Sequence, residues 1–451
     1  MKIIVIGCGT IGKTIVEHVS KEGHNIVVID SDKEKVENMI ERYDVVGVVG
    51  NGASLEILEE AGAKNADLVI AISSEDEINI LACMVAKKIG AESTIARVRN
   101  PEYLRQTKLM QNELGLSMIV NPEHETSAEI MNMINLPSIL KLEHFAKGKV
   151  NLVEILVEEG SLLAGETLIS MAKKIKTKVL ICAVQRGQEV IIPTGNFQIQ
   201  AGDHLNITAD ANALVSFLAE VNLNNTPLKK IMIIGGGKIG YYLADSLAKR
   251  KYKVKLIENN KERARELAEA LPKVTVIEGD GSDHDVLLEE GIKNTDACIS
   301  LTNIDEENII ISLYANKQNV TKVITKLKRN TFASMLDDLG IASAVLPKDI
   351  VASKIISYIR AVSNKRGSNV ITLYKLVNNK VEALEFYAKK KKRFFNKPLK
   401  ELSVKKNCLI ACIIRDGNVI IPNGNDCIMV DDSVLVVTTH QNFDDLSDAF
   451  E

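Results

Sequence analysis

Short β-branched runs alternate with helical patterns along the first part of the chain. Strand-like runs occupy 2–6, 25–30, 45–49, 67–72 and 93–98, and helical spacing fills 11–22, 32–42, 54–62 and 75–90. This order predicts an α/β fold with a parallel, doubly wound sheet. A helix near 123–136 would leave the sheet and lead into a second part.

The second part has a different pattern. From about 150 to 210, short runs with period-two alternation are separated by turn residues, as in "KVNLVEILV", "VLICAVQR", "GQEVIIP" and "DHLNIT". This pattern predicts a small, mainly β lobe.

The whole pattern occurs twice. "KIIVIGCGTIGKTIVEHVSKEGHNIVVID" (2–30) returns as "KIMIIGGGKIGYYLADSLAKRKYKVKLIE" (230–258), and "GQEVIIPTGNFQIQAGDHLNIT" (187–208) matches "DGNVIIPNGNDCIMVDDSVLVV" (416–437). Such self-similarity indicates a tandem duplication. The predicted domains are a large lobe at 1–136, a small lobe at 137–222, a large lobe at 229–364 and a small lobe at 365–451.

The first glycine-rich turn, "VIGCGTIGKT", fits two phosphate-binding patterns. G-x-G-x-x-G uses Gly7, Gly9 and Gly12, whereas the triphosphatase pattern G-x-x-x-x-G-K-[ST] also needs Lys13 and Thr14. The second copy distinguishes between the two patterns, because it has two tyrosines in place of Lys13 and Thr14 and keeps the three glycines. The duplicated feature is therefore the dinucleotide turn of a Rossmann-like sheet, and Lys13 and Thr14 form the first turn of a helix.

An acidic residue ends the second strand of each copy. Asp30 and Glu258 follow the glycines by about 20 residues, where a dinucleotide fold binds the ribose hydroxyls. Both would repel a 2′-phosphate, which favours NAD or an adenine nucleotide over NADP. The helix start after each turn supplies amide donors for phosphate. The candidate phosphate-binding residues are Gly7, Cys8, Gly9, Thr10, Ile11 and Gly12 in the first copy and Gly235, Gly236, Gly237, Lys238, Ile239 and Gly240 in the second.

Three further pairs of matched positions are candidate ligand contacts. Asn51 and Asp280 follow the third strand and could reach the adenine, although a plain glycine turn is the alternative. Arg97 and Lys326 end the fifth strand and could pair with phosphate, although a solvated strand-end charge is equally compatible. Ligands of such sheets bind at the carboxyl ends of strands. The fourth strand ends at Ile72 and Ser73 in the first copy and at Leu301 and Thr302 in the second, so these residues are candidate contacts as well.

Composition limits the function classes. The net charge of −3 and the mean hydropathy of +0.04 give no overall basic surface for a nucleic-acid partner. No apolar run reaches the length of a membrane span, so we expect a soluble, cytoplasmic protein that could dock on a membrane protein. The seven cysteines lie mostly in apolar runs, as reduced core residues do, and the scattered histidines do not predict a metal site.

The small lobes offer no catalytic cluster, since "RGQEVIIPTGNF" and "RDGNVIIPNGND" share only an arginine, a proline and glycines that indicate hairpins. The two glycine turns, the acidic strand ends, "GNG" and "GDG", and the lobes with "IIP-x-G" together resemble the TrkA family over almost the whole chain. Members of that family are peripheral subunits of Trk potassium-uptake systems, built from two tandem regulator-of-potassium-conductance (RCK) units.

The resemblance implies a regulatory subunit without enzymatic activity. It would form a homo-oligomeric ring, a tetramer, on the cytoplasmic face of a membrane-embedded potassium-translocating subunit, and would bind NAD(H) and ATP or ADP. NAD would occupy the first set of residues and a second nucleotide the other set. Asn51 departs from the aspartate that many members have, which weakens the expected adenine contact in the first site.

Two alternatives remain open for the function. One is an NAD-dependent oxidoreductase, and the other is a nucleotide-sensing module of another cation carrier. The basic run Lys389–Arg393 has no counterpart in the first copy. It is either a solvated loop or a contact for anionic lipid or an acidic partner.

Overall fold

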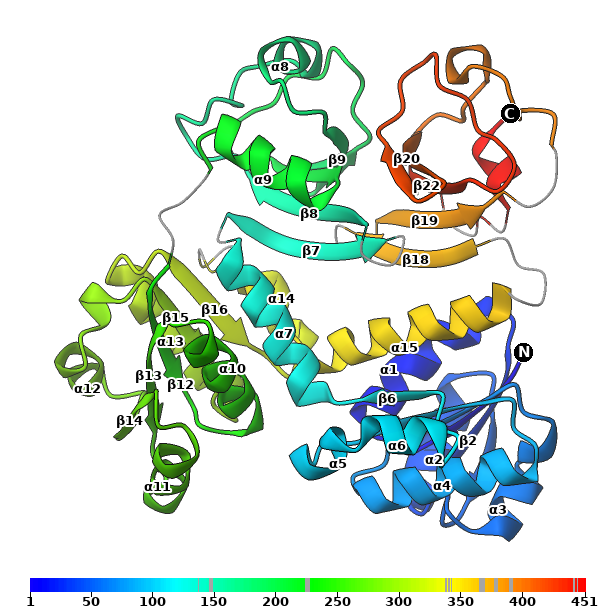
Figure 1. Ribbon diagram of the computed structural model, residues 1–451, viewed down its shortest axis with the longest axis vertical. Coiled ribbons are helices and arrows are strands. Elements are labelled where there is room, and N and C mark those ends of the chain that lie inside the picture. The colour runs from blue at the N-terminus through cyan, green and yellow to red at the C-terminus, as the bar shows by residue number, and fades with distance from the viewer. Residues whose placement is uncertain are drawn as a thin grey trace. The chain divides into compact units, whose positions relative to one another are not determined.

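The structure, a computed structural model, describes residues 1–136, 138–145, 149–223, 228–336, 339, 341, 343–364, 370–376, 380–388, 392–440, 443 and 445–451. The chain forms two compact units, and each joins segments from both copies of the repeat (Figure 1). Unit 1 contains Met1–Met131 and Lys229–Ile359, and unit 2 contains Asn132–Leu228 and Arg360–Glu451.

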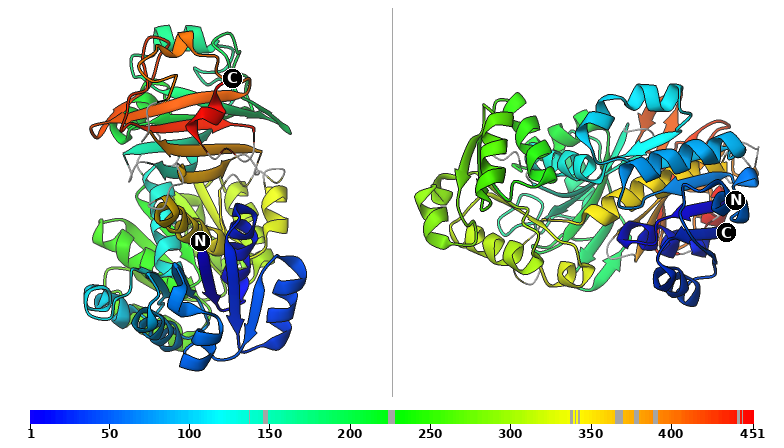
Figure 2. Two further views of the ribbon diagram at one scale, coloured as in Figure 1. Left: turned by 90° about the vertical axis from the view of Figure 1, so that its right-hand side faces the viewer. Right: turned by 90° about the horizontal axis from the view of Figure 1, so that it is seen from below.

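The first half of unit 1 is a six-stranded parallel sheet in the order β3-β2-β1-β4-β5-β6. This is the Rossmann order, so the predicted fold class is confirmed. Helices lie on both faces of the sheet (Figures 1 and 2). The elements are β1 (Lys2–Ile6), α1 (Thr10–Val19), β2 (Asn25–Asp30), α2 (Lys33–Arg42), β3 (Val46–Val49), α3 (Leu55–Glu60), β4 (Leu68–Ala71), α4 (Asp76–Ile89), β5 (Ser93–Arg97), α5 (Pro101–Arg105), α6 (Thr107–Asn112), β6 (Met118–Val120) and α7 (Pro122–Asn135).

The second half of unit 1 repeats this sheet in the order β14-β13-β12-β15-β16-β17. Its elements are β12 (Lys230–Ile234), α10 (Lys238–Lys249), β13 (Lys253–Glu258), α11 (Lys261–Ala270), β14 (Thr275–Glu278), α12 (His284–Glu289), β15 (Ala297–Ser300), α13 (Asp305–Lys317), β16 (Lys322–Lys326), α14 (Asn330–Leu336), β17 (Ala344–Val345) and α15 (Pro347–Asn364).

The sequence patterns located five strands of the first sheet and missed its sixth. The segment between β5 and α7 forms α5, α6 and the short strand β6, which pairs with β5 in parallel. A strand of three residues is too short to show a period-two pattern, and only its pairing with a neighbour defines it.

The two halves of unit 1 exchange their last helices. The apolar face of α15, from the second half, packs on β1 and α1 of the first sheet, with Val351, Ile355 and Ile359 in that buried core. In return, His124 on α7 of the first half makes an edge-to-face contact with Tyr242 on α10, at 5.8 Å between ring centroids. The second half of the repeat therefore completes the core of the first, and α7 of the first half contacts the second.

Unit 2 contains two antiparallel five-stranded sheets, ordered β10-β9-β11-β8-β7 and β18-β19-β22-β20-β21. The first lobe has β7 (Ile139–Phe145), β8 (Val150–Leu156), α8 (Leu168–Lys174), β9 (Leu180–Arg186), β10 (Glu189–Ile191), β11 (His204–Ala209) and α9 (Ala211–Glu220). The second has β18 (Val370–Leu376), β19 (Val381–Tyr387), β20 (Cys408–Arg415), β21 (Asn418–Ile420) and β22 (Ser433–Thr438). The sequence patterns had not indicated β7.

The arginine shared by the two lobes ends the first strand of the hairpin β9–β10 or β20–β21, and it binds an aspartate just before the strand that follows the hairpin. Arg186 forms two hydrogen bonds of 2.7 Å with the buried carboxylate of Asp203, and Arg415 bonds Asp432 in the same way.

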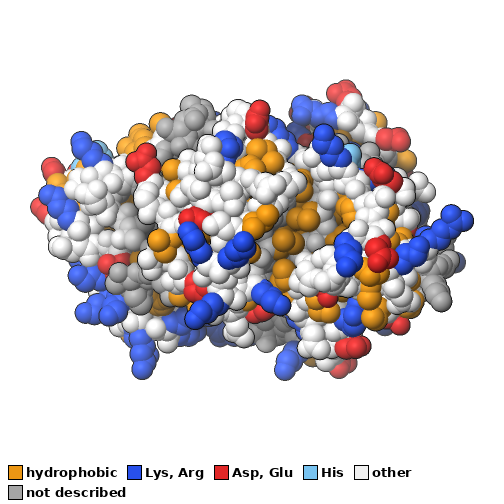
Figure 3. Space-filling view, turned by 90° about the horizontal axis from the view of Figure 1, so that it is seen from above, with side chains coloured by type: hydrophobic (Ala, Val, Ile, Leu, Met, Phe, Trp, Pro, Cys, Tyr) orange, Lys and Arg blue, Asp and Glu red, His pale blue; other side chains and the backbone are white. Residues whose placement is uncertain are grey.

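The surface of the described chain carries charges of both signs. In the face shown in Figure 3, Lys and Arg side chains are interspersed with Asp and Glu, and hydrophobic side chains gather near the middle. Of the basic run Lys389–Arg393, residues 389–391 lie outside the described residues, and the Lys392 Nζ lies 3.4 Å from an oxygen of Asp445. Among the described helices, none combines the length and the apolar character that a membrane crossing requires.

Candidate functional site

Both glycine turns have the backbone geometry of a phosphate-binding loop. Gly7 and Gly235 have φ angles of 104° and 105°, which residues other than glycine rarely adopt. A Cβ atom on Gly12 would lie 2.0 Å from the Gly7 carbonyl oxygen, and one on Gly240 would lie 2.2 Å from that of Gly235. The close approach of helix to strand thus requires glycine, and it points the first turns of α1 and α10 at the carboxyl edge of each sheet.

The acidic residue of each half holds the adjacent glycine turn. An oxygen of Asp30 accepts a hydrogen bond of 2.7 Å from the Cys8 amide, and an oxygen of Glu258 accepts one of 2.7 Å from Gly236. The carboxylates therefore lie at the start of the loop, beside the place where a ribose would lie next to the bound phosphates.

A buried asparagine organises the strand ends of the first half. The Asn79 side chain is fully buried on α4. Its Oδ1 accepts a hydrogen bond of 2.8 Å from the Ser73 amide, and its Nδ2 donates one of 3.0 Å to the Arg97 carbonyl. It thereby joins the ends of β4 and β5, where three of the predicted ligand contacts lie.

Asn308 does the same in the second half. It accepts from the Thr302 amide at 2.8 Å and donates to the Lys326 carbonyl at 3.0 Å. Sequence reasoning missed both asparagines. The signal was present, because "DEINI" and "DEENI" place an asparagine at the same position of each copy.

The side chains of Asn51 and Asp280 are engaged in their own turns. Asn51 Oδ1 accepts the Ala53 amide at 3.0 Å, and Asp280 Oδ1 accepts the Ser282 amide at 2.8 Å. These bonds give both residues a turn-forming role, and Asp280 additionally lines the cavity described next.

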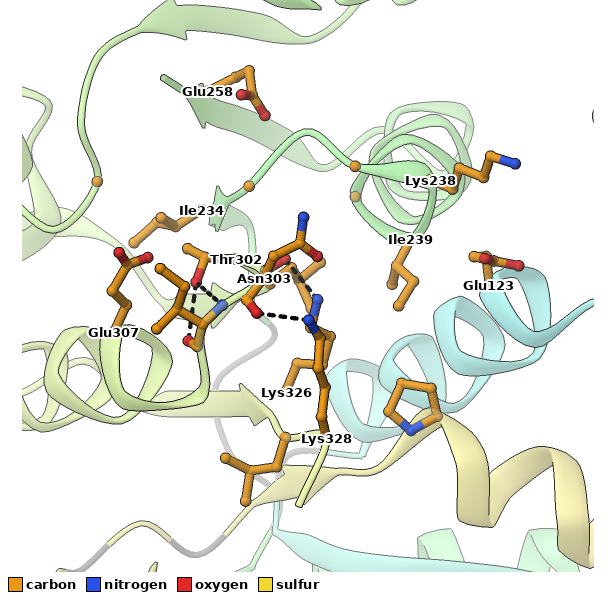
Figure 4. A pocket seen from close by; sticks show the side chains of 18 of the residues that line it. Glu123, Ile234, Lys238, Ile239, Glu258, Thr302, Asn303, Glu307, Lys326 and Lys328 are labelled. Atoms are coloured by element: carbon orange, nitrogen blue, oxygen red, sulfur yellow. Dashed lines mark hydrogen bonds between the residues drawn. The ribbon is translucent and has the colours of Figure 1, made fainter. Parts of the chain in front are cut away.

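A cavity of about 1330 Å³ opens at the carboxyl edge of the second sheet (Figure 4). This volume is ample for a dinucleotide, since ligand pockets usually measure about 300–1,000 Å³. Of the residues predicted for the second site, the lining includes Gly235, Gly237, Lys238, Ile239, Gly240, Glu258, Asp280, Leu301, Thr302 and Lys326. Gly236 is absent from the lining and instead donates its amide to Glu258.

The same cavity reaches the first half of unit 1. Thr10, Ile11 and Arg97 line it together with Arg99 and Glu123. The other residues predicted for the first site lie outside this lining, namely Gly7, Cys8, Gly9, Gly12, Asp30, Asn51, Ile72 and Ser73. One cavity thus joins most of the second predicted site to the phosphate end of the first.

The cavity is rich in cations, with eight Lys or Arg residues in its lining against four Asp or Glu. Burial, together with the neighbouring Arg99, lowers the pKa of Arg97 from its usual value. Burial also lowers the pKa of Lys326 to about 8, with a smaller contribution from Lys328. A cavity with this excess of positive charge favours an anionic ligand.

Sequence reasoning missed several cations of the lining, namely Arg99, Arg263, Lys328, Arg329 and Lys348. Part of the signal is visible, because "RVR" and "KLKR" both place a second basic residue two positions after the strand-end cation. Lys348 lies in the first turn of α15, just after β17, which pairs in parallel with β16.

Comparison with known proteins identifies the two parts of each copy. The TrkA-N domain family matches residues 3–122 and 231–347. The TrkA-C domain family matches residues 152–222 and 383–451.

Curated relatives match over nearly the full length. "Trk system potassium uptake protein TrkA homolog 1" of Methanosarcina mazei is 31% identical, over 97% of this chain and 97% of its own. "Trk system potassium uptake protein TrkA" of Haemophilus influenzae is 30% identical, over 97% of this chain and 95% of its own.

Solved structures share the fold. The GsuK RCK domain aligns with a TM-score of 0.62 and 17% identity, over 98% of this chain and 92% of its own. The GsuK channel bound to NAD aligns with a TM-score of 0.63 and 17% identity, over 98% of this chain and 77% of its own.

Proposed function

The chain belongs to the TrkA family, and from this premise we propose that it is the nucleotide-binding regulatory subunit of a membrane-embedded potassium-uptake protein of the Trk type. The observation that carries the proposal is the cation-rich cavity, which opens at a glycine turn with an acidic residue in register and is lined by both halves of unit 1.

The nucleotides are NAD(H) and ATP or ADP. Two solved relatives in fold, titled as GsuK channels bound to NAD and to ADP, support this choice. The first site consists of Gly7 to Gly12, Asp30, Asn51, Ile72, Ser73 and Arg97, and the second of Gly235 to Gly240, Glu258, Asp280, Leu301, Thr302 and Lys326.

Binding would act by shifting an equilibrium between arrangements of the two halves of unit 1. A ligand shifts such an equilibrium only when it contacts the two arrangements differently. The cavity supports this route, because a nucleotide on the second glycine turn would lie between residues of both halves, among them Lys238 and Arg99. A change in their spacing would then alter the number of phosphate contacts.

We further propose a homo-oligomeric ring, a tetramer, on the cytoplasmic face of the membrane, with the potassium-translocating subunit as partner. The names of the curated relatives, which are Trk potassium-uptake proteins, support the potassium-translocating partner. The four proposed domains are 1–136, 137–222, 229–364 and 365–451, and no nucleic acid is expected as a partner.

An NAD-dependent oxidoreductase is the less favoured function. Such an enzyme needs a proton-transfer group near the nicotinamide. The described residues that line the cavity include no His, Tyr or Cys, and we assign its buried lysine, Lys326, to phosphate binding. A nucleotide sensor of another cation carrier would have the same site and differ only in its partner.

Potassium uptake in a cell that lacks its own uptake systems tests the proposal. The full chain is co-expressed with a membrane-embedded potassium-uptake subunit of the Trk type, and uptake is compared with that of the membrane subunit alone. Calorimetric titration of the purified chain with NADH, NAD, ATP and ADP measures binding separately. We expect nucleotide binding and a change in uptake. Equal uptake with and without the chain would refute the transport role.

A further inference from the structure

The two sites have different cations at the end of the fifth strand. Arg97 ends β5 in the first half, and Lys326 ends β16 at the matching position of the second. An arginine stays protonated at any pH that a protein tolerates, whereas a buried lysine readily changes its pKa. The exchange of one for the other therefore changes how a site responds to pH.

Lys326 is buried with little to stabilise its charge. The residue is 6% exposed, and its Nζ donates a hydrogen bond of 3.0 Å to the Leu301 carbonyl. That carbonyl is its only hydrogen-bond acceptor within the described part of the chain. Figure 4 shows the side chain reaching toward the loop after β15, next to Lys328, whose Nζ bonds the Asn303 carbonyl.

Two carboxylates act on the Lys326 charge, and each also accepts a hydrogen bond from another group, while the second oxygen of Glu123 is buried without a hydrogen-bond partner among the described residues. Glu123, from α7 of the first half, accepts a hydrogen bond of 2.6 Å from Arg99, and Asp305 accepts the backbone amide of Lys328 at 2.9 Å. The charged groups that face Lys326 are Lys328 and Arg329 after β16, Asp305 and Glu307 on α13, Lys348 on α15, Lys238 on α10, and Arg97, Arg99 and Glu123 from the first half.

We propose that Lys326 is the titrating anion-binding residue of the second site, so that this site takes up a proton when a nucleotide binds, whereas the first site, with Arg97, does not. This inference rests on the proposed nucleotide-binding function and adds a pH response to one half of it.

The direction of the pH dependence of affinity follows from the negative charge of the nucleotide. Burial lowers the pKa of Lys326 to about 8 in the free site, and a phosphate beside the ammonium would raise it again. Affinity is then fully present below the pKa of the free site and falls as the pH rises through it. Between pH 7 and pH 9 the affinity should fall about tenfold, and proton uptake should rise from about 0.1 to about 0.9 per bound nucleotide.

Isothermal titration of the full chain measures both quantities. Asp30→Ala weakens the first site by about 10- to 100-fold, so that the second site dominates the titration. NAD is the main probe because its pyrophosphate does not titrate between pH 7 and pH 9. ADP is the second probe. Each titration is run at pH 7, 8 and 9 in two buffers with different ionisation enthalpies. The enthalpy difference between buffers gives the number of protons taken up.

Three variants assign the proton to its residue. Lys326→Arg in the Asp30→Ala chain should abolish proton uptake and make the affinity independent of pH. Lys326→Met should bind weakly at every pH, also without uptake. A chain with Glu258→Ala retains only the first site and should show no uptake. Lys322, whose pKa burial also lowers to about 8, begins β16, and the Lys326 variants leave it in place.

Each outcome decides one claim. Uptake that disappears in Lys326→Arg supports the inference. Binding with no uptake, or uptake that persists in Lys326→Arg, overturns the inference and leaves the nucleotide-binding function standing. If neither probe binds to the Asp30→Ala chain at any pH, the second half does not bind nucleotide, and the proposed second site is wrong.

Discussion

The lysine and threonine that suggest a triphosphatase are ordinary helix residues. Both lie on α1, and the Thr14 hydroxyl donates a hydrogen bond of 3.0 Å to the Thr10 carbonyl within that helix. A triphosphatase would instead use this hydroxyl to ligate magnesium. The duplicated copy had already indicated this assignment, since only the glycines and the acidic residue recur.

Lys13→Ala and Asp30→Ala should therefore have opposite consequences. The first should leave NAD and ADP affinity within about twofold. The second removes a charged hydrogen-bond acceptor and should weaken the first site by about 10- to 100-fold. Calorimetry in a Glu258→Ala background isolates that site. A large loss of affinity in Lys13→Ala would restore the triphosphatase assignment.

Two glycines of the second turn separate stability from binding. Gly240→Ala should destabilise the fold by about 1–3 kcal/mol, because its Cβ would meet a backbone oxygen that cannot move aside. Gly237→Ala is the matched control, since a Cβ there has no atom within 4 Å. We expect it to unfold like the parent chain while binding nucleotide more weakly. Thermal unfolding and calorimetry report the two properties, and equal stability of both variants would contradict this prediction.

At the scale of elements, the periodicity of apolar residues and the positions of turn residues located most strands of the parallel sheets. The predicted runs 2–6 and 25–30 are β1 and β2. Burial on both faces makes such strands continuously apolar, so they are visible in a single sequence. The short strand β6 was missed, and so was the partner of α15, because a helix shows which face is apolar but not which sheet it covers.

The exchanged helix α15 should stabilise the half of the repeat to which it does not belong in sequence. Ile355→Ala removes a fully buried side chain from the core of the first sheet and should cost about 2–5 kcal/mol. Hydrogen exchange should accelerate in β1 and α1. Ile310→Ala on α13 is the control, because Ile310 is 54% exposed. Faster exchange confined to the second half would contradict the exchange of helices.

At the scale of the molecule, the compact units differ from the repeats. Unit 1 joins the two large lobes and unit 2 joins the two small ones. In unit 2 the pairing is reciprocal, since Lys149 of the first lobe donates to the Gly417 carbonyl of the second at 2.8 Å, and Lys380 donates to the Gln188 carbonyl at 2.7 Å. One repeat alone would expose both of these interfaces.

A fragment of residues 1–228 should consequently self-associate. It lacks α15 and the second small lobe, so apolar residues of the first sheet and of the first small lobe would face water. Light scattering coupled to size exclusion should give a dimer or larger species. Co-expression with residues 229–451 should restore a particle with the composition of the intact chain. A stable, monomeric 1–228 fragment would refute this expectation.

The sequence by itself determined the duplication, the doubly wound fold and the glycine turns with their acidic partners. These features are local or periodic, and each is set by backbone geometry within a few dozen residues. Only the tertiary structure decided that Arg99 and Glu123 line the cavity of the second site, and that α15 covers the first sheet. Such contacts join segments more than a hundred residues apart, and the apolar faces that meet are chemically alike, so no pattern along one copy specifies its partner.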